Sequence, residues 1–130
     1  MPCVGALVHD DEGRLLVVRR AHEPSAGRWS VPGGRVEAGE HDHQAVVREV
    51  LEETALHVVV GARVGTVQRP GPAGVVYDIR DYACALAVDT TPIAGDDATE
   101  VRWVSRQELL QLDLVDGLVD SLSDWGMLPR

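Results

Sequence analysis

The chain has 130 residues, 45% of them hydrophobic, and a formal net charge of −9. This length supports one hydrophobic core, so residues 1–130 are expected to form a single domain. The acidic balance argues against binding of a nucleic-acid polymer, because such binding needs a basic surface opposite the phosphates.

Apolar and β-branched runs between breaker residues predict six strands. In chain order they cover residues 4–8, 15–19, 29–31, 58–68, 75–88 and 100–104. A hairpin turn at residues 10–13 joins the first two strands, and Pro32-Gly33-Gly34 is expected to form a turn before the first helix.

Three helices are predicted, one central and two near the end of the chain. The central helix covers residues from about 42 to 55. Ser105 is expected to cap a short helix, because Glu108 follows it at the spacing of a capping box. The final helix is predicted over residues 112–125. This order indicates the α/β class, with a mixed β-sheet and helices on its faces, as in an α/β/α sandwich.

The ends of the chain and its two cysteines bear on where the protein works. No basic segment followed by a long apolar run opens the sequence, so neither a signal peptide nor a membrane span is predicted. Cys3 and Cys84 have no C-x-x-C spacing and are expected to be reduced thiols. These features predict a cytoplasmic protein.

The central helix carries Glu49, Glu52 and Glu53 at spacings of three and four residues. At about 100° per residue these side chains share one face. Like charges at such spacings destabilise a helix by roughly 0.2–0.5 kcal/mol per pair. The cluster is therefore either a solvated face or a cation site. Carboxylate oxygens are the ligands that hard cations such as Mg²⁺ prefer.

The opposite side of the same helix is aliphatic and is expected to face the core. It carries four branched side chains, Val46, Val47, Val50 and Leu51. Ala45 lies within the acidic arc, where a small side chain is expected to leave room for a ligand. His41 or Asp42 is the expected N-cap.

The residues in and before this helix resemble the Nudix box. The matching positions are Gly34, Glu40, Arg48, Glu49, Val50, Glu52, Glu53 and Leu56. The family usually has glycine at the position of Ala55. The lead-in at residues 29–32 and the acidic residue and strand at residues 97–104 also resemble family segments, so the likeness covers essentially the whole chain.

The resemblance implies the Nudix α/β/α fold and hydrolysis of a pyrophosphate bond in a nucleoside diphosphate linked to another group. Mg²⁺ is the implied cofactor, with Mn²⁺ as an alternative. ADP-ribose, another nucleotide sugar or a nucleoside triphosphate would be the substrate. A non-catalytic Nudix-fold nucleotide-binding or regulatory module is the second hypothesis, and an acidic cation-binding domain is the third. The expected partner is a small-molecule nucleotide, without nucleic acid or membrane, and a homodimer is compatible with the pattern.

Carried over position by position, the resemblance implies Glu49 and Glu53 as the main metal ligands. Glu52 would be a further ligand or the residue that orients and deprotonates water. The Gly33 carbonyl would complete a metal shell. Asp97 is a candidate extra ligand or base, and an ordinary turn aspartate is the equal alternative.

Arg48 belongs with Glu49 and Glu52 in the implied catalytic group, because its guanidinium would orient the glutamates. Gly34 and Glu40 are implied to be structural positions of the motif. Residues that could contact the substrate are spread along the chain, and each also fits a surface or core role. They are Arg19, Arg20, Arg28, Arg35, Arg69 and Arg80 for phosphate, and Tyr77, Tyr82 and Trp29 for base stacking. Arg28, Arg35, Arg80 and Tyr77 are the leading candidates among them.

Overall fold

The computed structural model describes residues 1–87, 91–95 and 97–130. Its strands, in chain order, are β1 (Pro2–Val8), β2 (Leu15–Arg20), β3 (Trp29–Ser30), β4 (Gly33–Arg35), β5 (Val58–Pro70), β6 (Val76–Leu86) and β7 (Ala98–Val104). Its helices are α1 (Asp42–Thr54), the 3₁₀ turn η1 (Pro72–Gly74), α2 (Arg106–Gln111) and α3 (Leu118–Asp124). The predicted strand end at Val88 lies outside the described residues.

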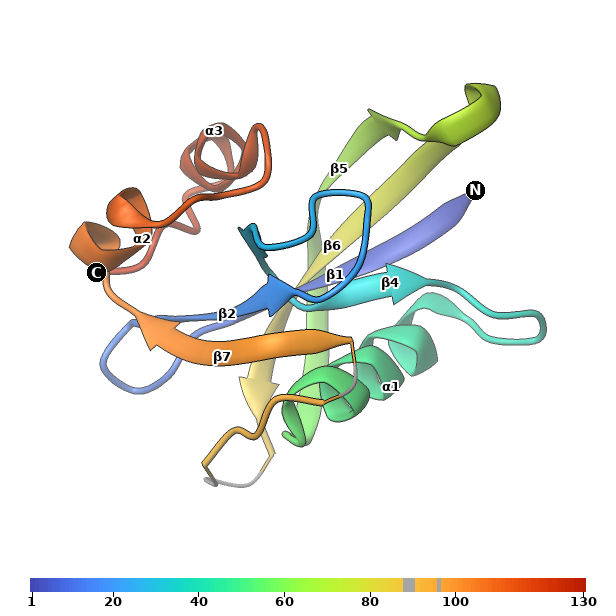
Figure 1. Cartoon of the computed structure of the whole chain (residues 1–130). Helices are drawn as coiled ribbons and strands as arrows, with labels where there is room; N and C mark the ends of the chain where they lie inside the picture. Colours follow the sequence, from blue (N-terminus) through green and yellow to red (C-terminus); the bar gives the residue numbers. More distant parts are fainter. Residues whose placement is uncertain (88–90, 96) are drawn as a thin grey trace.

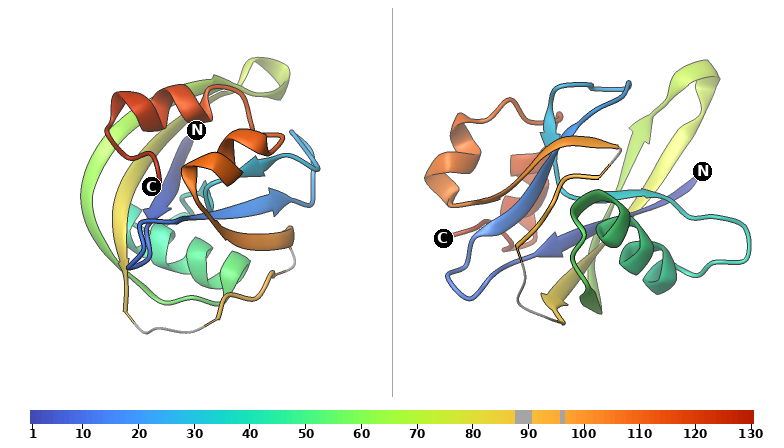
Figure 2. Two further views of the ribbon diagram at one scale, coloured as in Figure 1. Left: turned by 90° about the vertical axis from the view of Figure 1, so that its left-hand side faces the viewer. Right: turned by 60° about the horizontal axis from the view of Figure 1, so that its bottom comes forward.

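The strands form two sheets between layers of helix (Figure 1). Strands β4, β1, β6 and β5 make a mixed sheet, in which β1 runs parallel to β6. Strands β3, β2 and β7 make a second, antiparallel sheet. Helix α1 lies on one side of the strands, and α2 and α3 lie on the other (Figure 2). The predicted α/β class with a mixed sheet is confirmed, and the second sheet is an addition to it.

Two hydrophobic clusters hold these layers together. The cluster under α1 joins Val46 and Val50 to Val4 and Ala6 of β1. The second cluster lies beneath the C-terminal helices. It contains Leu7, Leu15, Val17, Trp29, Val104, Leu109 and Leu122. Side chains of β1 alternate between the two clusters, because successive residues of a strand point to opposite faces. Strand β1 therefore lies between the two hydrophobic clusters and contributes side chains to both.

Helix α1 is rotated from its predicted orientation. Val46 and Val50 are buried as expected, but Val47 and Leu51 are 36% and 41% exposed. The expectation for Ala45 was also wrong, because Ala45 is fully buried in the core rather than open to a ligand. The helix packs through a mixed face that includes two glutamates, and this face was not evident from its apolar pattern.

Gly33 and Gly34 form a strand rather than the predicted turn. They lie in β4, where Gly33 pairs with Gly5 and Gly34 pairs with Val4 of β1. Glycine is suited to this pairing because a Cβ on Gly33 would collide with the Val4 carbonyl oxygen. The segment is extended because the edge of the mixed sheet supplies hydrogen bonds that the local sequence does not reveal.

The other local predictions are largely confirmed. His41 is the N-cap of α1. Ser105 and Glu108 form the predicted capping box of α2. The last helix is shorter than predicted, because the chain before Gly117 follows Trp29 through a backbone bridge to Leu114.

Both cysteines are free, as predicted. Among the described residues, no helix is both long and apolar enough to cross a lipid bilayer.

Candidate active site

The N-terminal end of α1 is anchored to β6 by a charged network. Arg80 Nη2 donates to Asp42 Oδ1 over 2.6 Å, and the Tyr82 hydroxyl donates to Asp42 Oδ2 over 2.6 Å. The hydrogen bonds from Arg80 lower the pKa of Asp42 to about 2. The carboxylate therefore stays charged and holds the start of the helix on the sheet.

Nearly two turns further along, Arg48 donates hydrogen bonds to three carboxylates. Its Nε and Nη2 donate to the two oxygens of Glu40, at 2.7 and 2.9 Å. Its Nη1 donates to Glu49 Oε1 at 2.8 Å and to Glu52 Oε2 at 3.2 Å. Nη2 also donates to the Arg35 carbonyl at 2.9 Å. Arg48 thus ties the loop before the helix, strand β4 and the glutamates into one unit.

Glu49 and Glu53 lie one helical turn apart and are both buried, with 9% and 8% exposure. The Gly33 backbone N–H donates to Glu53 Oε2 over 3.1 Å. A Cβ on Gly34 would lie 2.6 Å from Glu49 Oε1, so only glycine leaves space for that carboxylate. Strand β4 therefore provides a backbone surface against which the two side chains fit.

The environment of these carboxylates favours their protonated forms. Burial raises the pKa of Glu53 to about 8, against the hydrogen bond from Gly33. Burial also raises the pKa of Glu49, against the hydrogen bond from Arg48. By contrast, hydrogen bonding to Arg48 lowers the pKa of Glu40 to about 2. Both glutamates are removed from water, and the hydrogen bonds and positive charge near them do not offset the resulting rise in their pKa values.

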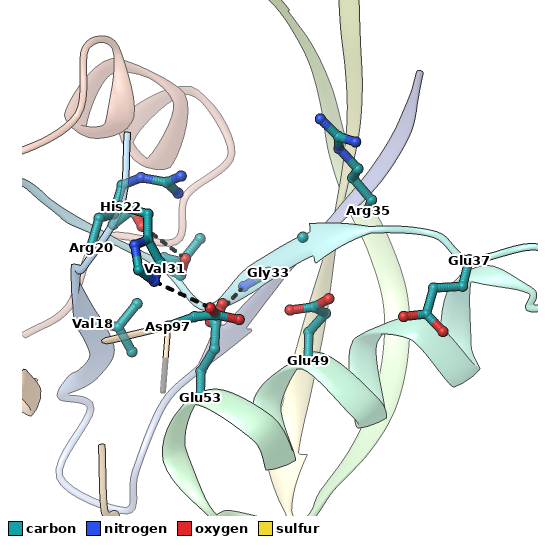
Figure 3. Close-up of a pocket in the computed structure, with 12 residues that line it drawn as sticks. Val18, Arg20, His22, Val31, Gly33, Arg35, Glu37, Glu49, Glu53 and Asp97 are labelled. Atoms are coloured by element: carbon teal, nitrogen blue, oxygen red, sulfur yellow. Dashed lines mark hydrogen bonds and ion pairs between the residues drawn. The ribbon is translucent and has the colours of Figure 1, made fainter. Parts of the chain in front are cut away.

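A cavity of about 400 Å³ opens beside these glutamates (Figure 3). The residues that line it come from β2, the loops around it, β4 and α1: Val18, Arg20, His22, Ser30, Val31, Gly33, Gly34, Arg35, Glu37, Glu49, Glu53 and Asp97. Glu49 and Glu53 rise from α1 along one wall, and Arg20 and His22 lie across from Glu49 (Figure 3). The lining of the cavity thus combines the carboxylates of Glu49 and Glu53 with the basic side chains of Arg20 and His22.

Asp97 reaches this cavity from the segment before β7. Its Oδ1 lies 3.8 Å from His22 Nε2, and the two side chains are 62% and 71% exposed. Such an open pair contributes little to stability. Asp97 adds a carboxylate to the cavity lining, which also contains Glu37, Glu49 and Glu53.

The sequence matches the family model of the NUDIX domain over residues 1–125. The chain belongs to the Nudix family. The predicted resemblance is therefore confirmed, and the acidic helix α1 is the Nudix helix of this protein.

Curated relatives of this Nudix chain are pyrophosphate-cleaving enzymes by name. It is 36% identical over 115 residues to the CTP pyrophosphohydrolase of Escherichia coli, covering 85% of this chain and 80% of that protein. It is 33% identical over 105 residues to the ADP-ribose pyrophosphatase of Methanocaldococcus jannaschii, covering 79% and 61%. A match to a putative 8-oxo-dGTP diphosphatase of Bacillus subtilis, 41% identical over 64 residues, covers 49% and 41%. The chain thus spans less than two thirds of two of these three relatives.

Solved Nudix structures share the fold. The MutT NUDIX hydrolase of Burkholderia pseudomallei superposes with a TM-score of 0.81 at 27% identity, covering 94% of this chain and 95% of that one. The E. coli ORF135 protein gives a TM-score of 0.75 at 28% identity, covering 95% and 88%. The Nudix α/β fold predicted from the sequence is therefore confirmed.

The structure brings about half of the predicted site residues to the cavity. Those that line it are Gly33, Gly34, Arg35, Glu49, Glu53 and Asp97. Arg48 and Glu40 lie behind this lining and connect to it through Glu49. Glu52 is not among the lining residues, and its half-exposed side chain is held by Arg48.

The predicted substrate contacts are mostly elsewhere. Arg80 is engaged by Asp42, and Arg28 Nη1 donates to Asp116 Oδ1 over 3.0 Å. Tyr77 lies outside the cavity lining and beneath Arg35, whose guanidinium carbon is 5.8 Å from the ring centroid. Of the four leading candidates, only Arg35 is among the residues that line the cavity. Its guanidinium extends away from Glu49 toward Tyr77 (Figure 3).

Arg20 was one of six arginines considered for phosphate contact but not a leading candidate, and His22 was not selected as a site residue from the sequence. They lie at the end of β2 and in the loop that follows, well before the Nudix box, and they meet it only through the fold. Nothing in their local sequence separates them from other surface arginines and histidines. Their proximity to a cluster of carboxylates depends on how the two sheets pack.

Nudix hydrolases generally use divalent metals, and the donor set here fits such an ion. Glu49 and Glu53 are desolvated carboxylates with raised pKa values, which is the environment that a hard cation stabilises. Within the described part of the chain, no three His, Cys, Asp or Glu side chains gather as a complete cation site. Water and substrate oxygens commonly fill the remaining positions around Mg²⁺.

Proposed function

We propose that this protein is a Mg²⁺-dependent Nudix pyrophosphohydrolase that cleaves a nucleoside diphosphate linked to another group. The observation that carries the proposal is the pair of buried carboxylates, Glu49 and Glu53, on the wall of a cavity that also holds Arg20 and Arg35. Carboxylates suit a cation and arginines suit phosphate oxygens, so the site suits a metal-bound diphosphate.

In this reaction water adds to one phosphorus of the diphosphate, and the bond from that phosphorus to the bridging oxygen breaks. The products are a nucleoside monophosphate and the phosphorylated second group. A bound Mg²⁺ would neutralise the phosphates and lower the pKa of the attacking water. Glu49 and Glu53 would hold the ion, with the Gly33 carbonyl as a further ligand.

The other residues of the motif support these two glutamates. Arg48 orients Glu49 through a charge-assisted hydrogen bond, and Glu40 fixes Arg48 in turn. Glu52 or Asp97 accepts the proton of the attacking water. Asp97 already lies at the cavity, whereas Glu52 must first leave Arg48.

Phosphate binding falls to Arg35 and Arg20. Arg35 lines the cavity and is the best placed of the predicted substrate residues. Arg28, Arg80 and Tyr77 are left with supporting roles, since carboxylates or Arg35 already engage them. The proposed donors are all oxygen atoms, which suit Mg²⁺ and also the alternative, Mn²⁺.

A soluble nucleotide fits the cavity better than a nucleic-acid polymer. The cavity is small, about 400 Å³, and the net charge of −9 repels a polyanion. We place the single domain in the cytoplasm, where nucleotides and Mg²⁺ are abundant, with a homodimer as a compatible assembly.

The test is turnover of a nucleotide panel, comprising ADP-ribose, nucleotide sugars and nucleoside triphosphates, with Mg²⁺, with Mn²⁺ and with EDTA. Release of a nucleoside monophosphate is measured by chromatography. We expect turnover that EDTA abolishes and that Glu53→Gln lowers by at least roughly 10²-fold. Glu12→Gln, at an exposed turn, is the matched control and should keep wild-type rates.

Two outcomes would contradict the proposal. Full activity of Glu53→Gln would exclude this glutamate as a ligand. Absence of turnover across the panel, with nucleotide binding retained, would instead support the non-catalytic binding module.

A further inference from the structure

Residues 91–95, ahead of β7, lie against the C-terminal end of α1 through backbone hydrogen bonds. The Ile93 N–H donates to the Thr54 carbonyl over 2.8 Å, and the Gly95 N–H donates to the Glu53 carbonyl over 2.9 Å. The last carbonyl groups of a helix have no partner within the helix itself. This segment therefore caps the end of the helix that carries the proposed metal ligands.

Gly95 lies directly against the backbone of the helix. A Cβ at this position would collide with the Glu52 carbonyl oxygen and would lie 3.5 Å from Glu53 Cα. Because the obstacle is helix backbone, no change of side-chain rotamer can relieve the collision, and the segment itself would have to move. Glycine therefore lets this part of the chain approach α1 closely.

Two residues beyond Gly95, the chain reaches the cavity at Asp97. The Ala98 N–H donates to the Gly95 carbonyl over 3.2 Å, and the Ala21 N–H donates to the Asp97 carbonyl over 3.2 Å. Ala98 also pairs with Arg20 in the register of β7 and β2. The backbone around Asp97 is thus held between the end of α1 and the end of β2, which lie on different sides of the cavity.

The side chain of Asp97 is open to solvent. It is 62% exposed and lies 3.8 Å from the similarly exposed His22, in a pair of little stabilising value. Burial is the main cause of the raised pKa values of Glu49 and Glu53, and the negative charge of Asp97 adds to both. The carboxylate therefore acts on the site, and its place there depends chiefly on where its backbone is held.

We propose that Gly95 is a positioning residue for the reaction, because its contact with α1 sets the place of Asp97 relative to the proposed metal ligands. This inference rests on the proposed pyrophosphohydrolase function. It takes Asp97 as the proton acceptor, because Asp97 lines the cavity while Glu52 is held by Arg48. As water bonds to phosphorus its proton passes to the Asp97 carboxylate, and the bridging oxygen leaves with the electrons of the broken bond.

This role makes the rate sensitive to the position of the segment. A proton acceptor must lie within hydrogen-bond reach of the attacking water. A displacement of about 1 Å can lower a rate by roughly 10²-fold. A methyl group at residue 95 would have to clear a carbonyl oxygen, so it would move the segment and carry Asp97 away from the water.

The test is a double-mutant cycle of Gly95→Ala and Asp97→Asn, measured with Mg²⁺ on the nucleotide of the panel that the wild type cleaves fastest. We expect Gly95→Ala to lower kcat by about 10-fold or more. KM should change by less than about twofold, because the metal and phosphate contacts stay in place. In the Asp97→Asn background the same substitution should lower kcat by less than about twofold, because the displaced group no longer accepts a proton.

Gly61→Ala is the matched control. A Cβ on Gly61 would lie 3.0 Å from the Ala83 carbonyl oxygen, so this substitution also crowds a backbone carbonyl. Gly61 belongs to β5 and is not among the residues that line the cavity. Gly61→Ala should therefore keep the wild-type kcat in both backgrounds.

Ile93→Pro gives a second way to release the segment, should Gly95→Ala reduce the yield of folded protein. It removes the N–H that donates to Thr54, and its effect should show the same dependence on Asp97. Ile93→Ala keeps that N–H and removes a side chain that is 66% exposed, so it should keep the wild-type kcat. Partial unfolding lowers kcat by one factor in either background and cannot imitate the expected cycle.

Three outcomes would overturn the proposal. Equal losses of kcat in both backgrounds would leave Gly95 with a structural role alone. Wild-type kcat in folded Gly95→Ala would show that the contact is not needed, and wild-type kcat in Asp97→Asn would remove Asp97 from the reaction. In each case the proposed function stands if Glu53→Gln still abolishes turnover. If the wild type cleaves no nucleotide of the panel, the proposed function itself fails.

Discussion

The carboxylates at the two ends of α1 lie in environments that shift their pKa values in opposite directions. At the N-terminal end, Asp42 meets Arg80 and Tyr82, and its pKa is lowered to about 2. Toward the C-terminal end, Glu53 has a backbone N–H as its partner, and its pKa is raised to about 8. A compensated carboxylate anchors the helix, whereas an uncompensated one retains affinity for a cation. We propose that this contrast separates structural acidic residues from metal-binding ones within a single helix.

The largest expected effect tests the uncompensated end. Glu49→Gln should lower kcat by at least roughly 10²-fold, as proposed for Glu53→Gln, because each removes charge from the cation site. The melting temperature without divalent ions should stay the same or rise, since a desolvated charge has been removed. Activity and thermal melting with and without Mg²⁺ provide the measurement. A variant that loses stability but keeps activity would reverse the assignment.

Arg48 links the two kinds of carboxylate, so its loss should affect both activity and stability. Arg48→Met leaves Glu40 and Glu49 without their shared guanidinium, and we expect kcat to fall by roughly 10-fold or more, with a lower melting temperature. Arg48→Lys keeps the charge but not the fork, and should recover only part of the loss. Recovery to wild-type kcat by lysine would show that charge alone is sufficient.

Asp42 tests the compensated end. Asp42→Asn should lower the free energy of unfolding by about 1–3 kcal/mol, because it removes an ionised acceptor from Arg80 and Tyr82. The kcat with Mg²⁺ should remain close to that of the wild type. Asp11→Asn, at the exposed hairpin turn, is the control and should change neither quantity.

The same network predicts a pH dependence. The pKa of Asp42 is lower in the folded state than in the unfolded chain, where it is near 3.8. Its stabilisation is therefore fully present above about pH 4 and is lost as the pH falls toward 2. Denaturant unfolding between pH 2 and 6 should show this loss in the wild type and a shallower slope in Asp42→Asn. Parallel slopes would contradict the role of Asp42.

The smallest expected effect concerns Ala55, which caps the helix where the family usually has glycine. Ala55 has φ 62° and ψ 13°, in the left-handed region that favours glycine. Ala55→Gly should stabilise the protein by up to about 1 kcal/mol, offset in part by the greater freedom of glycine in the unfolded chain. Ala45→Gly, within the buried helix, should destabilise it instead. Melting temperatures of the two variants suffice to test this prediction.

The sequence alone determined the Nudix family, the α/β class, and the start and end of α1. Those features follow from local spacing, because helix periodicity, caps and the motif residues lie within a short stretch. The capping box of α2 was predictable for the same reason. The acidic residues of the motif could be named in advance, since their spacing places them on one helix.

Only the tertiary structure decided which of these acidic residues are buried and which groups they contact. The packing of α1 on β1 buries Glu49 and Glu53 while it exposes Val47 and Leu51. Sheet pairing also extends Gly33 and Gly34 into β4.

Long-range pairing likewise assigned the partners of distant residues. It binds Arg80 to Asp42, brings Arg20 and His22 to the cavity, and joins Gly95 to the end of α1. These contacts join residues far apart in the chain. Strand register and helix rotation are set by the packing of the whole core rather than by local pattern.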